Sequence, residues 1–333
     1  MMELMFETYN VPGLFIAKSS ALAAFSVGRS TSMVVDCGGG GTSVVPVLDG
    51  YVLNKPIQRS HRGGEWLTEQ VHNFLGKQSI TVHPRYAVNR KRTRDGTLAS
   101  DLAAFPKTHP SYVQRCRLEA VQGLKEAVCG LPLVRFSNQD LAAHLPVPGM
   151  PSTYELPDGT PINLSPELFR VPEMLFDDDE HRSEQGPEKG TASSSSVAAG
   201  SAVAAASAAV PSSSSSQSPA TPAGPHVALQ KMVHKSLSLC DVDVRKELAG
   251  SILLTGGGAQ FKYMPERLQR EVTALVPSSY KVRVIAPSNI ERRFGVWIGG
   301  SIVSSLGSFQ QMWLSKTEYH ELGRVLAEQR FTG

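Results

Sequence analysis

The chain has 333 residues, 41% of them hydrophobic, which is enough to bury a sizeable core in one large domain or two ordinary ones. Its formal net charge of +3 argues against a protein that binds nucleic acid chiefly through a basic face. The 4 cysteines lack metal-ligand spacing, and no apolar run reaches the roughly 20 residues that cross a bilayer, so we expect reduced thiols, no metal site and no membrane partner.

The first half of the chain alternates strand and helix patterns. In chain order, we expect a buried strand over 13–18, a helix over 19–27, strands over 32–36 and 42–48, and helices over 64–75 and 112–128. Asp49-Gly50 is typical of a tight turn between antiparallel strands. Pro157-Asp158-Gly159 predicts a second hairpin over 154–164.

Residues 177–225 are first acidic and then almost wholly Ser, Ala, Pro and Gly. Such a segment buries too little apolar surface to offset its ordering entropy, so we expect a disordered insertion. Beyond it we expect a helix closing over 245–249, strands over 251–255 and 281–285, and helices over 265–276 and 294–306. Ser315 and Glu318 form a capping-box pair that opens a final helix. This mixture indicates an α/β protein with at least two lobes.

Two strand-to-glycine turns are candidate sites for chemistry. Asp36 ends one strand ahead of glycines 38–41, whose backbone amides suit phosphate oxygens, and its carboxylate could hold hydrated Mg²⁺. Glycines 256–258 follow another strand, and Phe261 could pack against a base. Either run is equally consistent with a tight turn, because neither has Walker A or Rossmann spacing.

Several segments resemble signatures of the actin family. They are residues 3–12, residues 28–31 with the loop after Asp36, and residues 170–176, 240–246, 296–302 and 309–316. Within that family, residues 3–7, Lys18, Ala24-Phe25, 291–294 and 305–309 are most similar to the nuclear actin-related proteins of SWI/SNF-type remodellers and histone acetyltransferase complexes.

The resemblance implies an α/β actin-like fold, shared with Hsp70 and sugar kinases, in which two lobes enclose an ATP and Mg²⁺ cleft. The implied divisions are 1–27 as a remnant of the first lobe, 28–176 and 226–294 as the second lobe, 177–225 as an insertion, and 295–333 as a return to the first lobe. The residues that it assigns to nucleotide are Asp36, Gly38, Gly39 and Gly40 at the phosphates, and Lys125, Glu126, Gly256, Gly257, Gly258, Phe261 and Arg293 at the adenosine. From the residues alone, Lys125 and Glu126 indicate a solvated helix face.

Four departures from the family pattern bear on activity. The chain begins in the middle of the fold, so we expect an incomplete first lobe and weakened nucleotide binding. Ser19 stands where actin has a glutamine that orients the attacking water, and Gly39 replaces an acidic residue. The insertion at 177–225 falls in a loop used in filament contacts. These departures predict a protein that does not hydrolyse ATP.

Two functions compete at this point. One is a non-catalytic nuclear scaffold subunit that pairs with actin and a helix of a remodeller or acetyltransferase subunit, and meets nucleosomes or histones indirectly. The other is an ATP-hydrolysing, actin-like cytoskeletal protein. The basic cluster at residues 90–94 is consistent with a solvated loop, a nuclear-import signal, or a contact to DNA or histone. We expect apolar Phe309, Met312 and Trp313 to line a groove for the helix, or else to be core.

Overall fold

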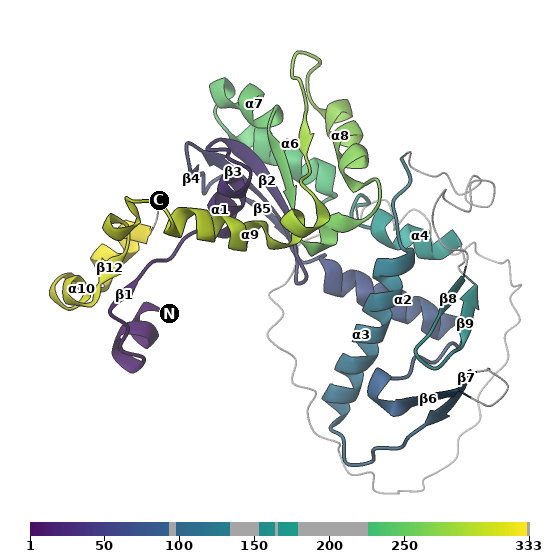
Figure 1. Ribbon diagram of the computed structural model, residues 1–333. Helices are drawn as coiled ribbons and strands as arrows, with labels where there is room; N and C mark the ends of the chain where they lie inside the picture. Colours follow the sequence, from purple (N-terminus) through teal and green to yellow (C-terminus); the bar gives the residue numbers. More distant parts are fainter. Residues whose placement is uncertain (93–97, 134–152, 164–165, 179–225, 332–333) are drawn as a thin grey trace, which may run out of the picture.

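A computed structural model describes residues 1–92, 98–133, 153–163, 166–178 and 226–331 (Figure 1). Its centre is a six-stranded sheet in the order β11-β10-β2-β3-β4, with β5 also paired to β3. The strands are β2 (Ser32–Cys37), β3 (Thr42–Leu48), β4 (Tyr51–Val52), β5 (Gln58–Ser60), β10 (Ile252–Thr255) and β11 (Val284–Ile285). The β10 strand runs parallel to β2 and β11, whereas β3 is antiparallel to its neighbours.

Both faces of this sheet are buried, which explains its nearly continuous apolar strands. Along β2, Met33 and Val35 point into one core, while Val34 points into another on the opposite face. The larger core includes α6 (Leu229–Leu239), α7 (Val242–Ala249) and α8 (Met264–Leu275). The opposite face is covered by α1 (Ser19–Ser26) and α9 (Asn289–Ser304), as Figure 1 shows.

A smaller lobe extends the larger core away from the sheet. It is built on α2 (Gly64–Lys77) and α3 (Pro110–Val128), with η2 (Arg85–Ala87), α4 (Pro166–Glu173) and the hairpins β6 (Val88–Arg92)–β7 (Leu98–Leu102) and β8 (Thr153–Glu155)–β9 (Pro161–Asn163). Leu67 of α2 and Leu124 of α3 belong to the same buried cluster as Met33 of β2. The small lobe therefore shares its core with the sheet body.

The two ends of the described chain pack against each other in a terminal unit that projects from the sheet body (Figure 1). It contains η1 (Leu4–Thr8), β1 (Gly13–Leu14), η4 (Phe309–Gln311), β12 (Leu314–Ser315) and α10 (Lys316–Phe331). Antiparallel β1 and β12 join the ends, and the Phe6 and Tyr319 rings stack with centroids 4.5 Å apart. The Glu318 amide donates to Ser315 Oγ, which confirms the capping box predicted before α10.

Most expected elements are present with shifted ends. The strands expected over 13–18 and 281–285 shrink to the two-residue β1 and β11. Helix α9 begins at Asn289 rather than at 294, because Ser288 and Glu291 form a capping box that the prediction missed. Helix α6 was not predicted at all. None of the described helices combines the length and the apolar character needed to cross a bilayer.

Hydrogen bonds and an ion pair join the described residues at the two ends of the predicted insertion. Asp178, expected inside the insertion, is buried; its carboxylate accepts a hydrogen bond from the Ala228 amide and pairs with Lys231. The Gln230 side chain donates to the Phe176 carbonyl 2.9 Å away. The predicted disorder of 179–225 lies outside the described residues. Helix α9 runs unbroken across the expected division between 294 and 295.

Of the three interpretations of the basic cluster at 90–94, the solvated loop does not fit its first residues, because they form strand β6. Arg90 is not free in solvent: its guanidinium donates to the carbonyls of Leu156 and Pro157, at 2.6 and 2.7 Å, and pairs with Glu155 at 3.0 Å. This arginine fastens one hairpin of the small lobe to the other. Residues 93–97 lie outside the described part, so the rest of the cluster is not placed.

Candidate functional site

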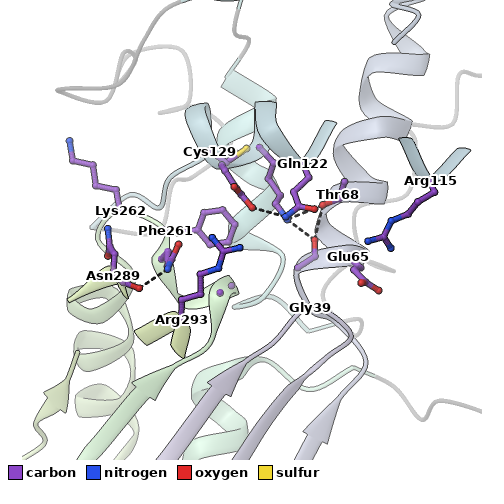
Figure 2. Close-up of a pocket in the computed structure, with 16 residues that line it drawn as sticks. Gly39, Glu65, Thr68, Arg115, Gln122, Cys129, Phe261, Lys262, Asn289 and Arg293 are labelled. Carbon is purple, nitrogen blue, oxygen red and sulfur yellow. Dashed lines mark hydrogen bonds between the residues drawn. The ribbon is translucent and has the colours of Figure 1, made fainter. Parts of the chain in front are cut away.

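A cavity of about 470 Å³ lies where the sheet body meets the small lobe. Its lining residues are Gly39, Gly64, Glu65, Thr68, Arg115, Gln122, Lys125, Glu126, Cys129, Gly257, Gly258, Gln260, Phe261, Lys262, Asn289 and Arg293. In Figure 2, Phe261, Lys262, Asn289 and Arg293 stand on one side, facing Thr68 and Gln122 on the other. Seven of the eleven residues assigned to nucleotide from the sequence line this cavity.

The two glycine turns lie together because β2 and β10 are adjacent parallel strands. Gly256 has φ +95°, and a Cβ there would lie 2.6 Å from Asp36 Oδ1 and 2.7 Å from the Cys37 carbonyl carbon. A Cβ on Gly258 would lie 2.8 Å from the Cys37 oxygen. Close packing of one turn on the other thus requires these two glycines. Gly257 has open space around it and faces the cavity.

The first glycine turn is held by its own backbone and by the start of α2. The Gly38 amide donates to the Gly41 carbonyl at 2.9 Å, so it is not available to a ligand. The amides of Gly64 and Glu65 donate to the carbonyls of Gly38 and Gly39, at 2.9 and 2.8 Å. In the part of the chain that the structure describes, the amides of Gly39 and Gly40 donate no hydrogen bond to the protein. They remain available to an anionic ligand.

Lys125 joins the two helices of the small lobe at the cavity wall. Its Nζ donates to the Gly64 carbonyl at 2.6 Å and to Thr68 Oγ1 at 2.8 Å. The residue is buried, and burial lowers the pKa of its ammonium group. The solvated face read from the residues alone is therefore wrong for Lys125. It holds for Glu126, which is exposed and accepts a hydrogen bond from Gln122 at 2.7 Å.

The opposite wall is fixed by the residue before Arg293. The Arg292 guanidinium donates to the Ala259 carbonyl at 2.8 Å, and its own carbonyl accepts from the Gly256 amide at 2.9 Å. These bonds tie the first turn of α9 to η3 (Gly257–Gln260), which ends beside Phe261. Arg293 is then exposed at the cavity edge. No sequence pattern indicates a structural role for Arg292, because its hydrogen bonds span more than thirty residues.

Four assigned residues, Asp36, Gly38, Gly40 and Gly256, do not line the cavity. Burial raises the pKa of the Asp36 carboxyl group. Ser19 begins α1, is exposed and is likewise absent from the lining. The lining residues that sequence reasoning missed are Gly64, Glu65, Thr68, Arg115, Gln122, Cys129, Gln260, Lys262 and Asn289. The pair Gly63-Gly64 ahead of a helical pattern was an available signal, since a Cβ on Gly63 would lie 2.8 Å from the Gly38 oxygen.

Comparison with known proteins places these features in a family. A family model described as actin matches residues 1–332. Actin-related protein 4 of Arabidopsis thaliana is 39% identical over 323 residues, which is 96% of this chain and 65% of that protein. Actin-related protein 4 of Oryza sativa subsp. indica is 40% identical over 322 residues, with the same coverage. The chain thus spans 65% of the length of these curated relatives.

Proposed function

Since the chain belongs to the actin family, with the α/β fold expected of it, we propose that it is a non-catalytic actin-related subunit of nuclear chromatin-remodelling or histone-acetyltransferase complexes. The observation that carries this proposal is the similarity to actin-related protein 4, at 39–40% identity along 96% of the chain. The sequence resemblance to the nuclear members points the same way. In this role the protein pairs with actin, binds a helix of a scaffold subunit, and meets nucleosomes or histones through the complex.

The cavity fits an adenine nucleotide with Mg²⁺ in part. The Phe261 ring and the Arg293 guanidinium offer a face and a charge to a base and its ribose. The free amide of Gly39, which lines the cavity, suits a phosphate oxygen. The Lys125 ammonium group donates two of its three N–H groups to the protein, so one N–H group is left for a ligand. These residues hold and orient a nucleotide, and the metal would neutralise charge at its phosphates.

Hydrolysis demands more than binding, because a water must be held in line with the terminal phosphate. Ser19 stands where actin has a water-orienting glutamine, and its short side chain is exposed outside the cavity lining. We therefore assign nucleotide a structural role in this protein. The competing function, an ATP-hydrolysing cytoskeletal protein, needs turnover that this arrangement does not support.

The C-terminal aromatic residues support the helix-binding role. The Phe309 ring meets Phe15 edge-on at 5.4 Å and Trp313 at 5.8 Å, so it is part of the packed terminal unit. Met312 and Trp313 remain 37% and 43% exposed. Phe309 therefore fits the alternative of core packing. Met312 and Trp313 fit the alternative of a groove, because they offer apolar surface to an amphipathic helix.

Affinity purification of the tagged protein from its own cells tests the scaffold role. We expect actin and remodeller or acetyltransferase subunits to co-purify, and recovery of neither class would overturn the proposal. Phosphate release by the purified protein should not exceed the buffer control. Sustained turnover that disappears in an Asp36→Ala variant would establish the competing function instead.

Nucleotide binding has its own test. Titration with a fluorescent ATP analogue should show weaker binding to Arg293→Ala than to the unmodified chain. Arg283→Ala, which removes an exposed arginine outside the cavity lining, is the matched control and should bind normally. Equal affinity of all three proteins would remove Arg293 from the site.

A further inference from the structure

A second pocket, of about 400 Å³, lies in the small lobe, and among the described residues it shares no lining residue with the cavity at the glycine turns. Figure 1 shows the β6–β7 and β8–β9 hairpins beside α3, and the pocket is formed by η2, β6, β8 and the turn that follows β8. Its lining combines polar and apolar side chains, namely those of Arg85, Val88, Arg90, Tyr154, Leu156 and Pro157. We call it the small-lobe pocket.

Arg85 contributes a guanidinium group that the protein itself does not use. The residue is exposed, and among the residues that the structure describes its guanidinium has no hydrogen bond or ion pair. Within the same described residues, the Tyr154 hydroxyl has no hydrogen bond to the protein either. Both groups lie against the backbone of α3 at Gly123, where a Cβ would be 3.1 Å from Arg85 Nη2 and 3.6 Å from Tyr154 Oη. The glycine therefore leaves room for two hydrogen-bond donors close together.

Arg90 adds a second guanidinium group, whose position is fixed by the protein. Its Nε and Nη2 donate to the carbonyls of Pro157 and Leu156, and its Nη1 pairs with Glu155 at 3.0 Å. These contacts use three of the five N–H groups of an arginine, so two remain for a ligand. Glu155 also lines the pocket, and the charged residues of the lining, two arginines and one glutamate, leave a net positive charge. Guanidinium groups placed in this way favour an anionic ligand.

We propose that the small-lobe pocket binds a phosphate monoester carried on a peptide, that is, a phosphorylated side chain of a partner protein. A phosphate dianion offers three acceptor oxygens to the donors of Arg85, Arg90 and Tyr154, whereas a carboxylate offers two oxygens and one charge. The apolar side chains of Val88 and Leu156 can contact the peptide on either side of the phosphate. Recognition of phosphorylated segments by clustered arginines is a recurring mode of peptide binding. The proposal does not depend on nucleotide binding.

Binding of a small phosphorylated probe to the complete 333-residue chain tests the proposal. The probe is N-acetyl-O-phosphoserine methylamide, followed by phosphorus NMR at about pH 7.5, where its phosphate is a dianion. We expect it to bind several-fold more tightly than inorganic phosphate, which has no group for the apolar lining, and than N-acetylglutamate methylamide, which has a single charge. Equal binding of inorganic phosphate would overturn the peptide as the source of the phosphate. Equal binding of the glutamate compound would overturn the preference for phosphate, and no binding of the probe would overturn the whole proposal.

Three substitutions establish where the probe binds. Arg85→Ala should weaken binding by about tenfold or more, with an unchanged melting temperature, because its exposed guanidinium makes no bond to the described protein. Glu155→Gln should tighten binding several-fold, because it removes the carboxylate that competes for Arg90. Arg293→Ala, at the other cavity, is the matched control and should bind the probe normally. Equal affinity of Arg85→Ala and the unmodified chain, or loss of binding in Arg293→Ala alone, would overturn the proposal.

Gly123→Ala provides a second variant that separates ligand binding from stability. Alanine raises helix propensity within α3, so the melting temperature should not fall. The added Cβ crowds Arg85 Nη2, which lies at the end of a flexible side chain and must move away from the pocket. We therefore expect a variant that is at least as stable as the unmodified chain but binds the probe several-fold more weakly. Unchanged affinity in this variant would contradict the placement of the ligand between Arg85 and Tyr154.

Discussion

Two neighbouring glycines of α9 should respond in opposite directions to the same substitution. Helices α1 and α9 cross with almost no space at Gly299: a Cβ there would lie 2.5 Å from the Leu22 carbonyl carbon and closer still to its oxygen. A Cβ on Gly300 would lie 3.8 Å from Leu22 Cδ1, which is an ordinary van der Waals contact. Gly299→Ala and Gly300→Ala therefore form a matched pair that differs in geometry alone.

The expected magnitudes follow from that geometry. A Cβ–backbone contact becomes ordinary at 3.4 Å, so clearing the Leu22 carbonyl carbon alone separates the two helices by about 1 Å, and clearing its closer oxygen requires more. A gap of that size forfeits roughly a quarter to a half of the dispersion energy across the interface, and overpacking costs about 1–3 kcal/mol or more. Alanine returns about 1 kcal/mol of helix propensity at either site. We expect Gly299→Ala to lose about 2–3 kcal/mol and Gly300→Ala to gain about 0.5–1 kcal/mol.

Urea unfolding followed by helical circular dichroism measures both changes, provided that the dependence on urea concentration is the same in all three proteins. The midpoint of Gly299→Ala should fall and that of Gly300→Ala should rise slightly. If both variants shift in the same direction, or if Gly299→Ala unfolds with the unmodified midpoint, the close crossing of α1 and α9 is refuted.

Two further predictions concern buried polar groups. The Arg267 guanidinium is buried and bonds Glu173 at 2.7 Å, so Arg267→Met should cost about 3–5 kcal/mol of unfolding free energy in urea titration, and adding Glu173→Gln should recover part of that loss. If the double variant recovers none of the lost unfolding free energy, the ion pair between Arg267 and Glu173 is contradicted. Burial raises the pKa of Cys37 and of Cys129 to about 12, so their stabilising effect is complete below the ordinary thiol pKa of 9.0 and is lost as pH rises toward 12. The urea concentration at the unfolding midpoint should therefore decrease as pH is raised from 9 to 11, and it should decrease less in Cys129→Ala. An equal decrease in that variant would exclude the Cys129 thiol as a cause. Maleimide at pH 8 should label the less buried Cys116 first, as peptide mapping can check.

Local pattern alone predicted the elements that carry the cavity. Short, nearly continuous apolar runs predicted β2 and β3, and the turn at Asp49-Gly50 was correctly predicted to join antiparallel strands. The two glycine turns at strand ends were predicted as candidate sites because the backbone amides of successive glycines can face phosphate oxygens. The same reasoning left open whether they bind ligand or merely turn the chain. It also failed for α6, and for the early start of α9 at Asn289.

Tertiary structure alone decided how those residues are used, because the deciding contacts join positions far apart in the sequence. From the residues alone Lys125 was interpreted as a surface residue, but its ammonium group donates a hydrogen bond to the carbonyl of Gly64, 61 residues away. Gly256 is required by packing against Asp36 rather than by a ligand, and Gly299 by the crossing with Leu22. Periodicity records which side chains are apolar, but it does not record which face of a helix a distant segment covers. Hence the exposed side of α9, with Trp297 at its centre, emerged only from the folded chain.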